Sequence, residues 1–98
     1  MNELLRVDRG PEPHVIVIDG ELDMSTTPLL DDAIQQARAS GVSDIVLDVA
    51  GLSFIDSRGL RSLLAAARDG AISLRTPSTS LQRLLSVSGL EEHFPVVD

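Results

Sequence analysis

The sequence predicts a single small α/β domain, with a mixed sheet of four to five strands and helices mainly on one sheet face. Short runs of β-branched and aliphatic residues alternate along the chain with longer segments whose apolar residues recur at helical spacing. The chain has 98 residues, which suits one domain with a shallow core. We therefore assign residues 1–98 to one domain.

Two strands are predicted near the N-terminus. Residues 3–7 are a candidate edge strand, and a turn with two prolines separates them from residues 14–19. The second segment contains four consecutive β-branched residues, which favours a strand buried on both faces. Residues 20–23 are predicted to leave the sheet and lead toward a helix.

The first helix has a well-marked start. Thr27 is the predicted N-cap, Pro28 suits the first helical position, and Asp31 and Asp32 are expected in the first turn, where the helix dipole favours acids. One apolar face is predicted at helical spacing, formed by Leu29, Leu30, Ala33, Ile34 and Ala37. Residues 40–41, Ser-Gly, are expected to end this helix.

The second half alternates strands and helices. Its predicted elements are a strand over 44–49, a helix over 57–68, a strand over 71–74, a helix entered at 77–79 and ended at 88–89, and a closing strand over 94–97. The unit from Ile45 to Leu74 is expected to form a right-handed parallel crossover.

Composition excludes several classes of function. The net charge of −7 and the absence of Trp and Tyr argue against nucleic-acid binding. Without cysteine, lysine or a glycine-rich phosphate loop, and with two histidines at opposite ends, we expect no metal and no cofactor. No apolar run is long enough to span a membrane and the first residues do not begin a basic signal sequence, so we expect a cytoplasmic protein without membrane insertion.

Acidic and basic residues are unevenly distributed. Residues 1–56 hold eleven acids and three arginines, whereas residues 57–98 hold four acids and five arginines. This asymmetry indicates a docking surface with a preference for charge sign, and a solvated acidic half is the alternative interpretation.

Ser57 is the candidate functional residue. It stands where a strand gives way to a helix, beside the carboxylate of Asp56, with Gly59 expected to keep the approach open. The first N–H groups of a helix are unpaired and favour anions, so this position is suited to adding or removing a phosphate. Arg58 and Arg61 lie within a turn and are expected to neutralise part of the phosphate charge. The alternative is that Ser57 simply caps the helix.

Three stretches carry a family resemblance. They are Gly20-Glu-Leu-Asp23, Phe54-Ile-Asp-Ser-Arg-Gly-Leu60 and Ser88-Gly-Leu-Glu-Glu-His-Phe-Pro95. In this order and spacing the chain, from His14 to Val97, resembles the STAS domain family and, within it, the bacterial anti-sigma factor antagonists.

The resemblance implies a phosphoprotein of stress response and transcription regulation. Unphosphorylated at Ser57, it would bind an anti-sigma factor with serine kinase activity and so release a sigma factor. Phosphorylation of Ser57 would end binding, and a serine phosphatase would restore it. The residues implied in partner binding are Asp23, Asp56, Ser57, Arg58, Gly59 and Arg61. Asp23 and Asp56 match family acids, whereas Arg58 stands where the family often has a small residue.

Other interpretations remain open. A hydrolase using Ser57 and His93 would need a Gly-x-Ser-x-Gly elbow, of which residues 55–59 supply the second glycine alone, so we expect no enzyme. A STAS scaffold subunit that is never phosphorylated, in a lipid-handling ABC transporter or a stress-signalling complex, is the closer rival. Asp23 is either a turn residue or part of the phosphorylation site.

Overall fold

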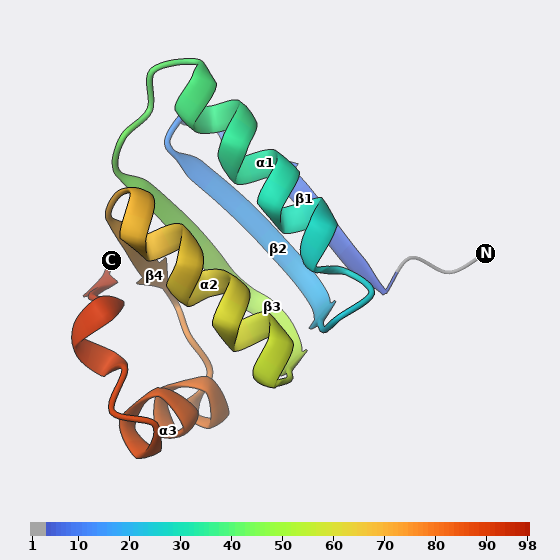
Figure 1. Cartoon of the computed structure of the whole chain (residues 1–98), viewed down its shortest axis with the longest axis vertical. Helices are drawn as coiled ribbons and strands as arrows, with labels where there is room; N and C mark the ends of the chain where they lie inside the picture. The colour runs from blue at the N-terminus through green and yellow to red at the C-terminus, as the bar shows by residue number, and fades with distance from the viewer. Residues whose placement is uncertain (1–3) are drawn as a thin grey trace.

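The computed structural model describes residues 4–98, which form a five-stranded mixed sheet and three α-helices (Figure 1). In chain order the elements are β1 (Leu5–Arg9), β2 (Val15–Leu22), α1 (Thr27–Ala39), β3 (Ile45–Ile55), α2 (Ser57–Asp69), β4 (Ile72–Arg75), α3 (Thr79–Val87), the 3₁₀ helix η1 (Glu91–His93) and β5 (Val96–Val97). The strands lie in the order β1-β2-β3-β4-β5, with β1 antiparallel to β2 and the other neighbours parallel. The predicted fold class is confirmed. Of the first predicted strand, Glu3 lies outside the described residues.

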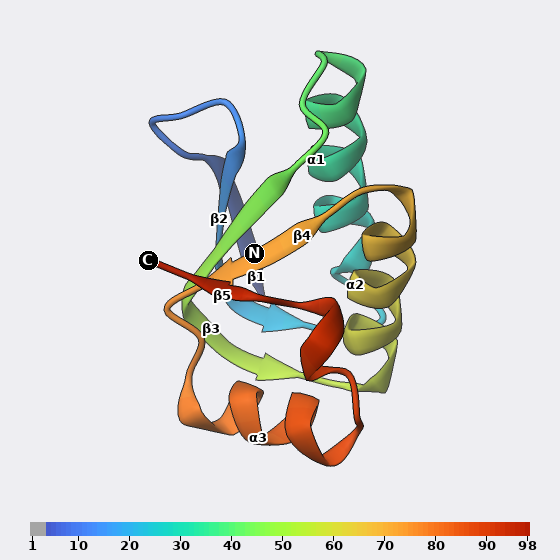
Figure 2. The same cartoon turned by 90° about the vertical axis from the view of Figure 1, so that its left-hand side faces the viewer.

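The helices are arranged in two places around the sheet. α1 and α2 lie side by side on one face, and α3 lies below the curved end of β3 (Figures 1 and 2). The main core fills the space between the sheet and α1 and α2, with Ile18, Leu47, Leu63 and Leu74 fully buried. The prediction of helices mainly on one face therefore holds for α1 and α2.

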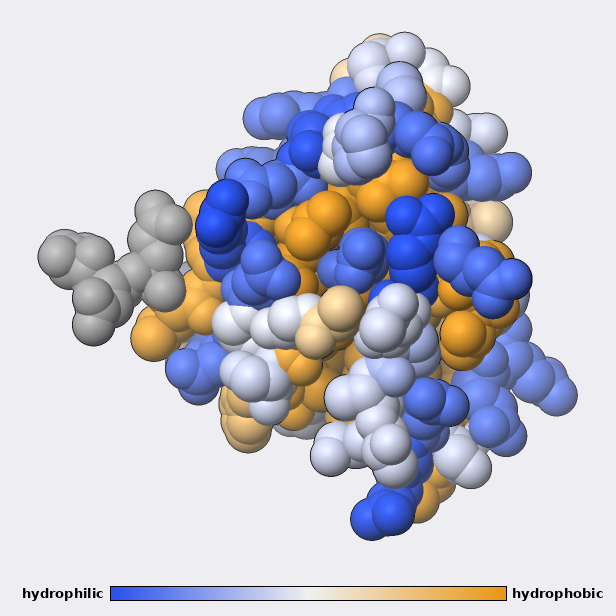
Figure 3. All heavy atoms as spheres, turned by 180° about the vertical axis from the view of Figure 1, so that it is seen from behind, coloured by the Kyte–Doolittle hydropathy of each residue, from blue (hydrophilic) through white to orange (hydrophobic). Residues whose placement is uncertain are grey.

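Among residues 4–98, no helix covers the opposite sheet face. Viewed from behind, apolar side chains lie there among charged ones (Figure 3). Because alternate residues of a strand point to opposite faces, the half-buried Val17 and Val46 belong to this face, next to Asp19 and Asp48.

β2 is longer than predicted. Residues 20–22 were expected to leave the sheet, but β2 continues through them to Leu22, and the Glu21 amide donates to the Leu4 carbonyl at 2.7 Å. Gly20 makes this possible because it has a φ of 110° and a Cβ here would collide with the Leu4 carbonyl oxygen. This glycine therefore lies inside the strand and does not end it.

β3 is also longer than the predicted 44–49 and contains two bulges. Its pairing with β2 shifts register between Val17 and Asp19 and again between Gly20 and Glu21. At the first shift the Asp48 carboxylate accepts the Ala50 amide at 3.2 Å, and at the second the Ser53 hydroxyl donates to the Gly20 carbonyl at 3.0 Å. Bulges bend a strand and increase its twist, which fits the curved β3 in Figure 2.

The predicted start of α1 is wrong in detail. Its N-cap is Thr26 and Thr27 is the first helical residue, so no acid lies in the first turn and Asp31 and Asp32 follow it. The fully or nearly buried side chains are Leu30, Ile34 and Ala37, at helical spacing. Leu29, predicted to belong to this face, is 49% exposed because it lies one residue to the side of that stripe.

Arg38 joins the C-terminal ends of α1 and α2. Its guanidinium donates to the carbonyls of Ser43 at 3.0 Å, Ala66 at 3.0 Å and Gly70 at 3.3 Å. Carbonyls at the end of a helix lack partners within the helix, and Arg38 donates to one in the last turn of α2, Ala66, and to that of Gly70, which follows the helix. The sequence analysis did not anticipate this contact.

The C-terminal elements lie close to their predicted positions. α3 begins after Ser78, whose hydroxyl accepts the Leu81 amide at 3.1 Å, and ends before Ser88 and Gly89, as predicted. The closing strand is shorter than 94–97. Phe94 is buried in the core, and Pro95 has no amide to donate but its carbonyl accepts the Leu74 amide at 2.8 Å, so residue pairing with β4 begins at Val96.

Candidate functional site

The carboxyl ends of β2 and β3 bring two predicted site residues to the same edge of the sheet. Leu22 and Ile55 are paired in the parallel ladder, and Asp23 and Asp56 directly follow them. The Asp56 amide donates to the Leu22 carbonyl at 3.2 Å, which ties the start of α2 to the end of β2.

Asp56, and not Ser57, caps α2. Its backbone is extended and its carboxylate accepts the Gly59 amide at 2.8 Å. Ser57 is the first residue of the helix and is exposed. Within residues 4–98 its hydroxyl makes no hydrogen bond, so the alternative in which Ser57 serves as the cap does not describe this helix. The serine is accessible beside the unpaired amides of the first turn.

Gly59 has a different role from the predicted one. It is buried, and a Cβ at this position would lie 2.5 Å from the Leu22 carbonyl oxygen and 2.9 Å from Ile55 Cγ1. The residue therefore allows the first turn of α2 to pack closely against the ends of β2 and β3. It does not keep an approach to Ser57 open.

Asp23 organises the turn before α1. Its carboxylate accepts the Ser25 hydroxyl at 2.7 Å and the amides of Ser25 at 2.9 Å and Thr26 at 3.2 Å. The hydrogen bond from the Ser25 hydroxyl is the main cause that lowers the pKa of Asp23 below its ordinary value of 3.8, and partial desolvation acts in the opposite direction. Of the two interpretations left open, this geometry supports the turn residue.

Thr26, and not the predicted Thr27, is the N-cap of α1 and belongs to this turn. It is the buried polar residue of this turn, 5% exposed, and its hydroxyl donates to the Glu21 carbonyl at 2.8 Å and accepts the Asp23 amide at 2.9 Å. Three hydroxyl residues follow one another here, and their order alone does not indicate which one turns inward.

Arg58 and Arg61 are exposed on α2 and line a surface depression of about 290 Å³ between α1 and α2, here called the Met24 hollow. Met24 and Asp31 line it from the other side, and the Ser62 hydroxyl donates to Asp31 at 2.6 Å. Arg61 also lines a second depression of about 190 Å³, the Ser57 hollow. The Ser57 hollow is formed by Ser57, Leu60, Arg61, Leu64 and Leu90.

Exposed apolar side chains lie near Ser57 in the chain and around the Met24 hollow. Met24 is 63% exposed and Phe54, three residues before Ser57, is 50% exposed. Large exposed apolar side chains near polar ones are typical of protein-binding surfaces. The sequence analysis did not include either residue in the site, because a pattern of residue types does not reveal which apolar side chains remain exposed.

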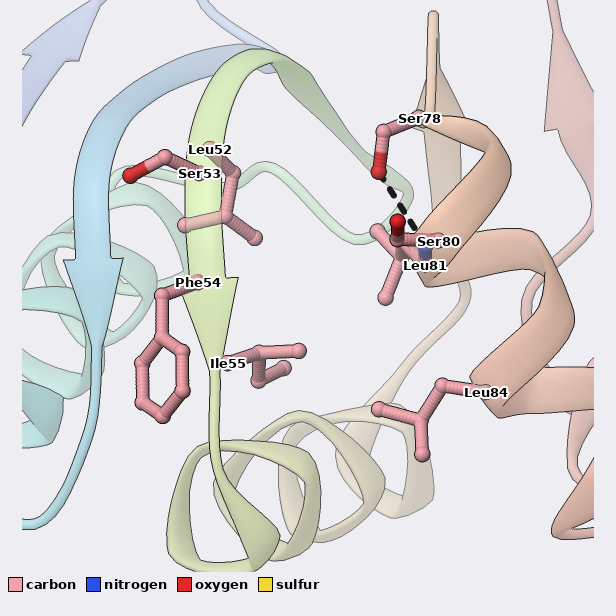
Figure 4. A pocket seen from close by; sticks show the side chains of 8 residues that line it. All are labelled: Leu52, Ser53, Phe54, Ile55, Ser78, Ser80, Leu81 and Leu84. Atoms are coloured by element: carbon pink, nitrogen blue, oxygen red, sulfur yellow. Dashed lines mark hydrogen bonds between the residues drawn. The ribbon is translucent and has the colours of Figure 1, made fainter.

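A small pocket separates the end of β3 from α3. It has a volume of about 160 Å³, and Leu52 and Ile55 face Leu81 and Leu84 across it (Figure 4). Its lining is mainly apolar and includes three serines, Ser53, Ser78 and Ser80.

The groups that a serine hydrolase requires are not brought together. Among residues 4–98 no hydrogen bond joins Ser57 and His93, and the His93 ring instead lies edge-on to Phe94, with 6.5 Å between ring centroids. In the same part of the chain no group of three or more His, Asp or Glu side chains is placed to hold a metal ion. None of the helices described is both long and apolar enough to cross a bilayer.

A family model described as "Mlab, STAS domain" matches residues 5–98. The chain therefore belongs to the STAS domain family, which confirms the predicted resemblance.

The relatives and solved structures reported below are named anti-sigma factor antagonists. An anti-sigma-B factor antagonist of Staphylococcus epidermidis is 27% identical over 84 residues, covering 81% of this chain and 78% of that protein. The crystal structure of an anti-sigma factor antagonist from Mycobacterium paratuberculosis superposes with a TM-score of 0.77 and 26% identity, covering 94% of this chain and 84% of the other. Unphosphorylated SpoIIAA, at 24% identity and a TM-score of 0.73, covers 96% of this chain and 88% of its own and shares the fold.

Proposed function

We propose that this chain is an anti-sigma factor antagonist controlled by phosphorylation of Ser57. Its unphosphorylated form binds an anti-sigma factor that has serine kinase activity, and this binding releases a sigma factor. Phosphorylation of Ser57 ends the binding and a serine phosphatase reverses the modification. The chain acts by binding and has no catalytic activity of its own. Support comes from the names of its relatives and from the structure of SpoIIAA solved in a phosphorylated form, which has the same fold with a TM-score of 0.67.

The accessibility of the Ser57 hydroxyl carries this proposal. Asp56 supplies the cap of α2, so Ser57 is exposed and its hydroxyl is not committed to a hydrogen bond within residues 4–98. A serine that capped the helix would have to give up that bond to reach the active site of a kinase. Here the hydroxyl is available without a change in the fold.

A phosphate at Ser57 is expected to act at the surface. It adds nearly two negative charges and three acceptor oxygens. Within residues 4–98 the amides of Ser57 and Arg58 donate no hydrogen bond. A helix N-terminus favours an anion by about 0.3–1 kcal/mol when exposed. The fold should therefore tolerate the modification. A partner that packs against Met24 and Phe54 would instead meet new charge and bulk next to an apolar contact surface.

Binding of a kinase-type anti-sigma factor from the same organism tests the proposal. Calorimetry should give similar affinities for the wild type and Ser57→Ala, whereas Ser57→Asp should bind about a hundredfold more weakly, a loss of roughly 3 kcal/mol. Ser86→Asp adds the same charge at an exposed position of α3 and serves as the matched control. Incubation with ATP and the kinase should add one phosphate to the wild type and none to Ser57→Ala. Unchanged binding by Ser57→Asp would contradict the proposal.

A second candidate function is a STAS scaffold subunit that is never phosphorylated. Arg58 favours it, because this residue places a large cation directly beside the serine, where the family often has a small residue. The intact mass of the protein isolated from its native cells separates the two candidates. A phosphate that phosphatase treatment removes supports the switch, whereas an unmodified mass in growth and stress alike supports the scaffold.

A further inference from the structure

Arg61 is the basic residue best placed to meet a phosphate on Ser57. The two residues are four positions apart on α2, where side chains are neighbours on one helix face with Cβ atoms about 6 Å apart. Side chains in a helix lean toward its N-terminus, so the side chain of Arg61 leans toward the turn that begins with Ser57. Both residues line the Ser57 hollow.

The other charged groups near Ser57 are less well placed. The Asp56 carboxylate is held by the Gly59 amide at 2.8 Å. Arg58 follows Ser57 directly, and adjacent helical residues do not face each other. Its side chain lines the Met24 hollow and not the Ser57 hollow.

Arg61 also has capacity for a new partner. Within the part of the chain that is described, residues 4–98, no carboxylate lies within ion-pair distance of its guanidinium. Leu60, Leu64 and Leu90 line the rest of the Ser57 hollow, so apolar side chains surround Arg61 there. A guanidinium binds a phosphate through paired N–H groups, which gives both attraction and a defined orientation.

We propose that Arg61 is a positioning residue that binds the phosphate of phosphorylated Ser57 and holds it against α2, over the Ser57 hollow. The inference rests on the proposed modification of Ser57. One side of the phosphate then faces the amides of Ser57 and Arg58, and another faces the guanidinium. The modified side chain is therefore held in one conformation on the helix. Bound in this way, the phosphate is also partly shielded from a phosphatase.

Titration of the phosphate by ³¹P NMR tests the inference. Phosphoserine is inserted at position 57 during translation, so that no kinase is needed. A nearby cation favours the dianion, so Arg61→Gln should raise the midpoint of the titration by about 0.3 pH unit. Arg61→Lys should recover part of the difference, and high salt should reduce it. Removal of the phosphate by a broad-specificity serine phosphatase should be about twofold faster in Arg61→Gln, as expected for the loss of a contact of this size.

Two arginines serve as matched controls. Arg68→Gln removes the same charge from the same helix about 16 Å away, beyond the screening length in physiological salt, and should leave the midpoint unchanged. Arg58→Gln should shift it less than Arg61→Gln does. An equal shift in Arg61→Gln and Arg68→Gln, or a larger one in Arg58→Gln, overturns the inference. A different result would refute the proposed function: equal binding of the anti-sigma factor by phosphorylated and unphosphorylated protein.

Discussion

Replacing Gly59 by alanine should destabilise the protein, although alanine is the better helix former. In an unconstrained helix the change would stabilise by about 1 kcal/mol. Here the new Cβ would lie 2.5 Å from the Leu22 carbonyl oxygen, and that oxygen is held in place because it accepts the Asp56 amide. Overpacking of this kind costs about 1–3 kcal/mol, and a backbone obstacle favours the upper end. We expect a net loss of about 1–2 kcal/mol.

Urea denaturation followed by circular dichroism measures this loss. In thermal denaturation, the melting temperature of a domain of this size should fall by roughly 5–10 °C. Ala65→Gly, at an exposed position of the same helix, is the matched control and should lose about 1 kcal/mol through helix propensity alone. In NMR spectra of Gly59→Ala the shifts should concentrate at the end of β2 and the start of α2. A Gly59→Ala protein as stable as the wild type, or more stable, would refute the role of the Leu22 contact.

Two further predictions concern the acids at the sheet edge. Asp56→Ala should lose about 1 kcal/mol of unfolding free energy because the cap is lost. Asp56→Asn keeps an acceptor for the Gly59 amide and should lose a few tenths of a kcal/mol at most. Equal losses of the two variants in urea denaturation would contradict the capping role of Asp56. The lowered pKa of Asp23 means that its contribution to stability is present above the unfolded value of 3.8 and is lost as the pH falls through the folded value. Asp23→Asn should therefore lose less stability than the wild type on acidification, with Asp44→Asn as the control for removing an exposed carboxylate, and an unchanged acid profile would count against this contribution.

The parts of the fold that the sequence predicted correctly are those with a local signal. α2 and α3 were placed within a residue or two because apolar spacing, a polar residue before each start and a glycine after each end agree with one another. Strands β2 and β4 were recognised from short runs of β-branched and aliphatic residues. These signals depend on neighbours in the chain and need no tertiary contact.

The far half of β3 was missed because its bulges hide the strand pattern. Buried positions follow at intervals of two up to Val49, and then at intervals of three to Leu52 and the half-buried Ile55. Glycine is a second source of error, because this residue type is typical of turns. Gly20 and Gly51 nevertheless both lie within paired strands. A Cβ at Gly20 would collide with Leu4 and one at Gly51 with Asp19, and both of these neighbours are distant in sequence.

Within the candidate site, the local roles of Asp56, Ser57 and Gly59 differ from those predicted from the sequence. Asp and Ser are both common caps and stand next to each other at positions 56 and 57, so local sequence does not decide which one caps the helix. The bond from the Asp56 amide to the Leu22 carbonyl favours Asp56, since it holds that residue in an extended conformation. The role of Gly59 likewise depends on the end of β2, which the sequence analysis had placed outside the sheet.

The bulges of β3 have a consequence for how chain length is tolerated near the site. From the first to the last pair with β2, β3 uses residues 46–55 where β2 uses 15–22. Deletion of one of the two extra residues would shift the start of α2 by one position relative to β2. Ser57 would then point in a different direction. Insertions and deletions between Asp48 and Asp56 should therefore be rare among proteins that keep the serine accessible, whereas the exposed turn at residues 11–13 should vary freely in length.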